Sequence, residues 1–111
     1  PHCLKDTDGW QIVPELTAQP LANGDRVIDK ETFGSVALGR TLLDMDQTER
    51  IVEVELVGLC TDICVISNVL LAKAFLPNAH IKVDSNCCAG VTPQSHETAL
   101  KAMQACHVEI V

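Results

Sequence analysis

The sequence lacks any cluster of basic side chains. Its eight lysine and arginine residues are scattered singly against fifteen aspartate and glutamate residues, and the formal net charge is -7. Nucleic acids and anionic membrane surfaces attract proteins through concentrated positive charge. The charge pattern therefore argues against nucleic-acid and membrane partners and favours a small molecule or another protein.

The chain also lacks a long hydrophobic run. No apolar stretch approaches the ~20 residues that a membrane-spanning helix needs, and no secretory signal peptide with a basic start is present. We therefore expect a soluble, cytoplasmic protein. Its 111 residues have the length of one ordinary domain, and 47% of them are hydrophobic, which is enough for a core.

The chain contains six cysteines. They sit inside apolar patterns in a chain whose core needs no covalent support, so we expect free thiols: Cys3, Cys60, Cys64, Cys87, Cys88 and Cys106. A structural zinc site is the alternative for some of them. It is disfavoured because zinc commonly uses closely spaced cysteine pairs, and Cys60 and Cys64 are one residue too far apart. Apart from Cys60 and Cys64, the cysteines are most simply core or loop thiols.

Apolar stretches alternate with segments of helical periodicity along the chain, which predicts a parallel α/β fold. The expected strands are Arg26 to Asp29, Ile51 to Leu59, His80 to Asp84 and His107 to Val111. The expected helices are Val36 to Asp46, Asp62 to Leu76, and one that Thr92 and Pro93 begin, with an apolar face of Ala99, Leu100, Met103 and Cys106.

The stretch GLCTDICV, Gly58 to Val65, joins the second expected strand to its helix. It therefore lies at the carboxyl edge of the sheet, where open α/β folds bind ligands. Cys64 falls in the first helical turn, where free N–H groups favour a thiolate and can also bind an oxyanion. A nucleophile and a buried packing thiol are equally good interpretations of Cys64 from position alone.

Two further residues are candidates for chemistry. Lys30 closes the stretch VIDK and is expected at the same sheet edge as Cys64, where it would stabilise negative charge. By pattern alone, however, a solvated surface lysine is the more common case. His2, in a Pro-His-Cys segment, is a candidate metal ligand, although a lone histidine usually binds no metal.

Four blocks of the chain together resemble the isochorismatase-like cysteine hydrolases and, within them, the nicotinamidase-like amidases. These blocks cover nearly the whole chain in order: PHCLKDTDGW, VIDKETFGS, GLCTDICV and CCAGVTPQSHETAL. The resemblance implies a three-layer α/β/α sandwich on a six-stranded parallel sheet. The isochorismatases proper lack the cysteine that matches Cys64, so its presence favours amide hydrolysis.

The resemblance also implies roles for individual residues. Cys64 is the expected nucleophile and Lys30 the expected catalytic lysine. A non-proline cis peptide is expected between Leu59 and Cys60, and the backbone N–H groups of Cys60 and Cys64 are expected to form the oxyanion hole. His2 matches one ligand of the metal, such as zinc, that some relatives bind, and no organic cofactor is expected.

One family feature has no counterpart in this sequence. The third catalytic residue is an aspartate in a D-x-x-x-D-F-like motif of the first strand, and no such motif is present. The chain also begins without methionine. We therefore expect residues 1–111 to be the C-terminal portion of one isochorismatase-like hydrolase domain, lacking the first two strands of a parent of roughly 170 to 200 residues.

These observations lead to a hypothesis about the intact protein. It hydrolyses a small primary amide, with nicotinamide as the leading candidate, through a thioester, and so acts in NAD salvage. A homo-oligomer is expected because the family commonly forms dimers or larger assemblies. The alternatives are a non-catalytic fragment or interaction subunit of the same fold, and a related hydrolase with another small-molecule substrate.

Overall fold

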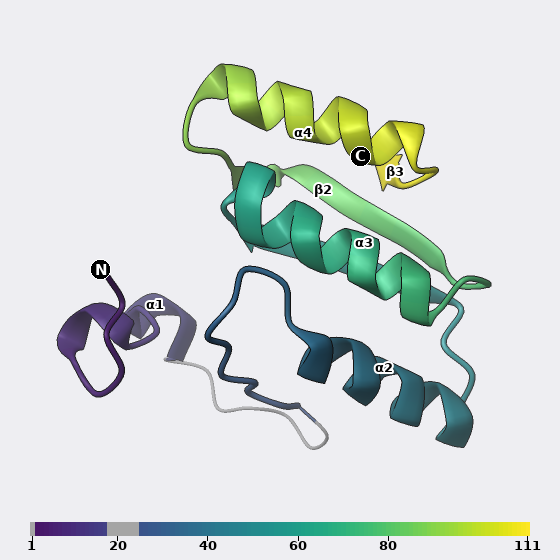
Figure 1. Cartoon of the computed structure of the whole chain (residues 1–111), viewed down its shortest axis with the longest axis horizontal. Coiled ribbons are helices and arrows are strands. Elements are labelled where there is room, and N and C mark those ends of the chain that lie inside the picture. The colour runs from purple at the N-terminus through teal and green to yellow at the C-terminus, as the bar shows by residue number, and fades with distance from the viewer. Residues whose placement is uncertain (1, 18–24) are drawn as a thin grey trace.

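The computed structural model describes residues 2–17 and 25–111. Its three parallel strands form one sheet in the order β1 (Glu53–Leu59), β2 (His80–Ala89) and β3 (Glu109–Ile110) (Figure 1). Each strand is followed or preceded by a helix, so the predicted parallel α/β architecture is confirmed. The first and last of these strands are shorter than predicted, and the middle one is five residues longer than His80 to Asp84.

Local capping groups decide where the helices begin. The side chain of Ser35 accepts a hydrogen bond from the N–H of Leu38 and starts α2 (Val36–Thr48). Thr92 forms a capping box with Ser95 and starts α4 (Pro93–Ala105), with proline in the first turn. Two short helices, η1 (Asp8–Trp10) and α1 (Pro14–Thr17), lie apart from the sheet (Figure 1).

The third long helix, α3 (Ile66–Phe75), is preceded by a separate turn, η2 (Thr61–Val65). The predicted helix from Asp62 to Leu76 is therefore two elements. In η2 the N–H of Val65 donates to the carbonyl of Cys60, five residues back, at 3.0 Å. This spacing is that of a π-helix, which often occurs at functional sites.

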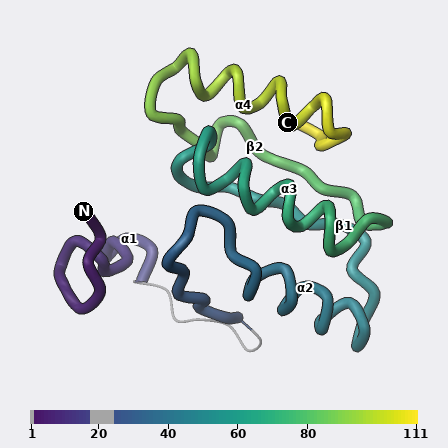
Figure 2. The backbone as a smooth tube through the Cα atoms, in the orientation of Figure 1, coloured from purple at the N-terminus to yellow at the C-terminus, as the bar shows by residue number. Residues whose placement is uncertain are grey.

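The core lies on one face of the sheet. Val54 and Leu56 of β1 lie opposite Ile81 and Val83 of β2, and all four belong to one apolar cluster. The cluster's other members include side chains of α3 and α4, and Leu76 directly after α3: Val69, Ala72, Leu76, Leu100 and Met103. Both helices therefore cover the same face, and the tube in Figure 2 shows them running alongside the sheet.

Helix α2 packs against α3 through a glycine. A Cβ atom added to Gly39 would lie 2.4 Å from ring atoms of Phe75, so only glycine allows this close approach. Leu42 of α2 also packs against the core cluster. In the loop before α2, which also carries Lys30, a Cβ atom added to Gly34 would lie 3.3 Å from the Cβ atom of Ser67, so this loop lies beside the start of α3.

The opposite face of the sheet is exposed. Lys82 of β2 pairs there with Glu53 at 3.0 Å and with Glu55 at 3.6 Å. Val57 and Leu59 of β1 point to the same side and are 55% and 70% exposed. Among the residues that the structure describes, β1 pairs only with β2, so its second edge is open.

Two sequence predictions are wrong. Residues Arg26 to Asp29 form no strand, because no described strand lies beside them and a strand needs a neighbour to pair its backbone groups. Cys106 is exposed, whereas the other three residues of its predicted apolar face are buried. The reason is that α4 ends at Ala105 and His107 turns away in the left-handed conformation, with φ 63°.

No helix among the described residues is long and apolar enough to cross a bilayer.

Candidate active site

The structure brings Lys30 and Cys64 together. The Nζ atom of Lys30 donates a hydrogen bond to the Sγ atom of Cys64 at 3.4 Å and another to the carbonyl oxygen of Thr32 at 3.2 Å. The second bond ties the Lys30 side chain to its own loop and holds its ammonium group beside the Cys64 sulfur. Cys64 itself is half-buried, so its thiol remains accessible.

Cys64 stands in the turn that leaves the carboxyl end of β1. The peptide bond between Leu59 and Cys60 is cis. After it the chain enters η2, in which the carbonyl of Cys60 accepts hydrogen bonds from the N–H groups of Ile63 and Val65, both at 3.0 Å. The turn therefore folds back over Cys60, and it places the Cys64 side chain at the start of α3.

Asn68 connects the two candidate catalytic segments. Its Nδ2 atom donates to the carbonyl of Cys64 at 2.9 Å and to the carbonyl of Phe33 at 3.1 Å, and its Oδ1 atom accepts from the N–H of Ser35 at 2.8 Å. The side chain is buried. One amide thus bonds both segments, and we expect it to help hold Lys30 beside Cys64. Sequence reasoning missed this residue, and the available signal was a single Asn in an apolar helix, four residues after Cys64.

A second set of polar groups binds the other side of the turn. The Oγ1 atom of Thr61 and the Nδ1 atom of His96 are hydrogen-bonded at 2.7 Å. The neighbouring Asp62 accepts a hydrogen bond from the N–H of Val91 at 3.2 Å. A hydrogen bond from the Ser95 side chain is the main reason that the pKa of Asp62 is lowered below its ordinary value of 3.8. Sequence reasoning assigned no role to His96.

A cavity of about 460 Å³ lies beside Cys64. Its polar walls include Lys30, Cys64 and Asn68, and its apolar walls include Leu38, Leu42, Val54 and Leu56. The cavity thus combines a thiol and a cation with an apolar surface, which is the usual composition of a small-molecule site.

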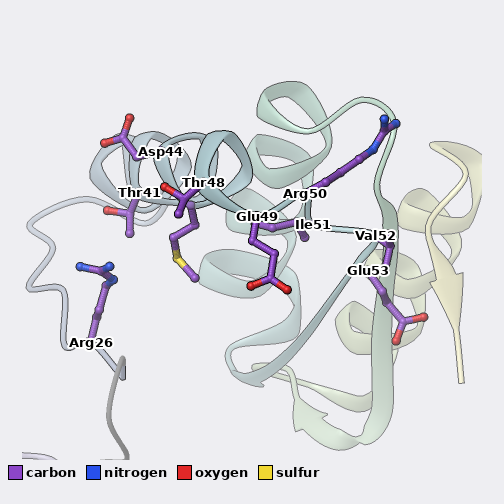
Figure 3. A pocket seen from close by; sticks show the side chains of 10 residues that line it. Arg26, Thr41, Asp44, Thr48, Glu49, Arg50, Ile51, Val52 and Glu53 are labelled. Carbon is purple, nitrogen blue, oxygen red and sulfur yellow. The ribbon is translucent and has the colours of Figure 1, made fainter.

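A second cavity, of about 690 Å³, lies elsewhere (Figure 3). It is formed by the carboxyl half of α2 and the chain leading into β1, with Arg26 facing α2 across it. Its lining contains Glu53 at the amino end of β1, whereas Cys64 follows the carboxyl end of that strand. It contains no cysteine or histidine and is not part of the candidate site.

The remaining thiols differ from Cys64 in their surroundings. All six cysteines are free. The carboxylate of Asp84 raises the pKa of the exposed Cys87 thiol, and burial raises the pKa of Cys88. Both shifts disfavour the thiolate, which is the reactive form of cysteine.

The described residues do not assemble a metal site. His2 is exposed, and no group of three or more histidine, cysteine, aspartate or glutamate side chains capable of holding a metal ion is found within residues 2–17 and 25–111. His2 therefore has no companion ligands there. The residues present do not fit a bound metal, and the chemistry below uses none.

Comparison with solved structures shows what this arrangement is similar to. A nicotinamidase from Bacillus subtilis is 26% identical with a TM-score of 0.83, and a pyrazinamidase/nicotinamidase from Streptococcus mutans is 28% identical with a TM-score of 0.80. Each comparison covers 100% of this chain and 62% of the other. A pyrazinamidase from Pyrococcus horikoshii, solved in complex with zinc, is 21% identical with a TM-score of 0.73 and shares the fold.

The chain thus spans about three fifths of the length of the solved relatives it matches, 62% in the first two cases. No curated protein sequence matches it. The model of the isochorismatase domain family matches the chain over residues 1–111. The chain therefore belongs to the isochorismatase domain family, whose fold its sheet and helices reproduce in part.

Proposed function

We propose that this protein is a cysteine-dependent amidohydrolase that acts on a small primary amide, with nicotinamide as the leading candidate. The observation that carries the proposal is the 3.4 Å contact between Lys30 Nζ and Cys64 Sγ. A thiol beside a fixed ammonium group, at the end of a parallel strand and next to a cavity, is a suitable arrangement for nucleophilic attack on a carbonyl.

The reaction has two halves. In the first, the Cys64 thiolate attacks the amide carbon, and an S–C bond forms while the carbonyl oxygen becomes an oxyanion. Lys30 and the backbone N–H groups of Cys60 and Cys64 hold this charge. The C–N bond then breaks, and the nitrogen takes a proton and leaves as ammonia. In the second half, water hydrolyses the thioester, which gives the carboxylic acid and the free thiol.

The general base is the one part that this sequence does not supply. The family resemblance assigns it to an aspartate of a motif that has no counterpart in residues 1–111. General acid-base help is typically worth about 10² to 10⁴ in rate. We therefore expect residues 1–111 alone to be a weak catalyst, and the activity assays below use the full-length protein.

Two observations support nicotinamide as the substrate. Two of the similar solved structures, at 26% and 28% identity, are named as nicotinamidases. The cavity beside Cys64 has apolar walls from α2 and β1, including Leu38 and Leu56, against which a flat ring would pack. Pyrazinamide, a ring of the same size with the same amide group, is the natural comparison.

The second candidate function is that of a non-catalytic interaction subunit, which would assemble with further copies or with another protein. The observation in its favour is the exposed sheet face, where Val57 and Leu59 of β1 are 55% and 70% exposed next to an open strand edge. Exposed apolar strands of this kind commonly pair with another segment. Thiol reactivity separates the two candidates, because only the enzyme requires an activated Cys64.

Replacement of the two turn cysteines tests the proposal. We expect Cys64→Ala to abolish ammonia release from nicotinamide in the full-length protein. The matched change Cys60→Ala should leave most of the activity, because Cys60 is proposed to act through its backbone N–H. Ammonia is measured with a coupled glutamate dehydrogenase assay, and substantial turnover by Cys64→Ala would refute the nucleophile assignment.

A further inference from the structure

The turn that carries Cys64 is bonded to α4 by a partly buried hydrogen bond. Thr61, the first residue of η2, is 0% exposed, and its Oγ1 atom lies 2.7 Å from the Nδ1 atom of His96. His96 is in the first turn of α4, where its own N–H donates to the carbonyl of Thr92 at 3.0 Å. Because the hydroxyl group of Thr61 is shielded from water, it has no solvent partner to replace the imidazole ring of His96. The position of Thr61 therefore depends on that of the ring.

The next residue of the turn is bonded to the same region. Asp62 accepts from the N–H of Val91, directly before α4, and its pKa is lowered mainly by a hydrogen bond from Ser95. Two consecutive residues of η2 are therefore held by the start of α4.

A glycine keeps His96 close to the turn. A Cβ atom added to Gly90 would lie 2.9 Å from both the backbone nitrogen and the Cβ atom of His96. Any side chain at this position would push the first turn of α4 outward. Because position 90 is glycine, the end of β2 can approach the first turn of α4 closely. This close approach lets the His96 imidazole reach Thr61.

We propose that His96, through its hydrogen bond to Thr61, is a positioning residue for the backbone N–H groups that hold the oxyanion. Thr61 follows Cys60 directly, and the carbonyl of Cys60 accepts the hydrogen bonds that close η2. The orientation of the Cys60 and Cys64 N–H groups therefore depends on where Thr61 is held. Asn68 bonds the far end of the turn and controls the distance from Cys64 to Lys30, so the two sides of the turn have separate tasks.

This inference rests on the oxyanion role given above to Cys60 and Cys64, and two reagents test it without the natural substrate. p-Nitrophenyl acetate acylates a thiolate: the S–C bond forms through an oxyanion, and p-nitrophenolate leaves. Iodoacetamide alkylates a thiolate by displacing iodide, and no oxyanion forms. The ratio of the two rates at Cys64, followed by mass spectrometry of the peptide, therefore reports on oxyanion binding alone.

Thr61→Val removes the hydroxyl group at constant size, and His96→Leu removes the ring nitrogen. In each variant the oxyanion donors are displaced and not removed, so we expect acylation of Cys64 to fall by up to on the order of 10²-fold, the effect of losing one donor outright. Alkylation, which forms no oxyanion, should be little changed. Thr61→Ser and His96→Asn keep a hydrogen-bonding atom and should recover much of the acylation rate. The double variant should be no slower than either single one, because both remove the same bond.

His80→Asn is the matched histidine control, since His80 pairs with Glu109 at the other end of the sheet and should affect neither rate. Equal losses of acylation and alkylation in the folded variants, or no loss of acylation, would overturn the inference, as would a wild-type Cys64 that is acylated no faster than the other thiols. Thermal melting identifies variants that fail to fold, and the conservative pair then decides. The proposed function fails separately, if the wild-type protein releases no ammonia from primary amides.

Discussion

The Nζ atom of Lys30 lies 3.4 Å from the Sγ atom of Cys64, although the two residues are 34 positions apart in the chain. Lys30 belongs to an irregular loop and Cys64 to the turn that follows the carboxyl end of β1. Neither segment determines the distance by itself. Asn68 binds both segments through their backbones, and we expect these hydrogen bonds to maintain the contact.

Removal of the lysine charge should slow the reaction. Lys30→Met keeps the length of the side chain but removes the ammonium group that we propose holds the developing negative charge. We expect kcat for amide hydrolysis to fall by about 10² to 10³, the range found when one oxyanion-stabilising donor is lost. Lys30→Arg should retain part of the activity. The control is Lys101→Met, an exposed lysine of α4, and wild-type turnover by Lys30→Met would contradict the assignment.

The six thiols should react at different rates. Iodoacetamide at neutral pH should label Cys64 ahead of the other five, because Lys30 attracts its thiolate. Cys87 and Cys88 should be slow, since the Asp84 carboxylate and burial, respectively, raise their pKa values. Peptide mapping at several times gives the order. If Cys64 reacts no faster than the exposed Cys3 and Cys106, the interaction-subunit candidate is favoured.

Asn68→Asp should disrupt the connection between the two segments. The carboxylate still accepts from the N–H of Ser35, but it can no longer donate to the carbonyl oxygens of Cys64 and Phe33 and would repel them. Leaving buried polar groups unpaired costs about 1–3 kcal/mol in the free energy of unfolding. Urea denaturation measures this loss.

The same variant should also slow alkylation of Cys64, because Lys30 is no longer held beside it. The control is Asn78→Asp, an exposed asparagine in the turn before β2. It should change neither stability nor alkylation appreciably. Wild-type alkylation by a folded Asn68→Asp protein would show that the lysine loop is positioned by other contacts.

Asp62 should make the stability of the protein depend on pH. Its pKa in the folded state is below the ordinary value of 3.8, mainly because of the hydrogen bond from Ser95. A lowered pKa means that folding favours the ionised form, so this stabilisation is present above the ordinary pKa and is lost as the pH falls through the folded value.

The difference in melting temperature between wild type and Asp62→Asn is the measurement. We expect it to be constant from neutral pH down to about pH 5 and to shrink on further acidification. Asp44→Asn, which removes an exposed carboxylate from α2, is the matched control. A difference that grows toward low pH would have the wrong sign and would exclude the proposed bonding of Asp62 to the start of α4.

Local signals in the sequence were sufficient for most of the secondary structure. Thr92 and Pro93 predict the start of α4 because capping and the fixed proline dihedral act within one turn. The apolar spacing of Leu100 and Met103 predicts the buried face, since helical periodicity is a local property. Order and spacing of four blocks were enough to indicate the family, which the match over residues 1–111 confirms.

Pairing between distant segments was decided only by the tertiary structure. The stretch Arg26 to Asp29 has the composition of a strand but forms none, because a strand requires a neighbour and none is described beside it. The sequence by itself determined which residue types could react: a cysteine at a strand end and a lysine closing an apolar stretch. Their contact, the bonding of both segments by Asn68, and the hold of His96 on Thr61 depend on side chains 33 to 35 positions apart. Such contacts form only when α2, α3 and α4 pack together, and no local pattern contains that information.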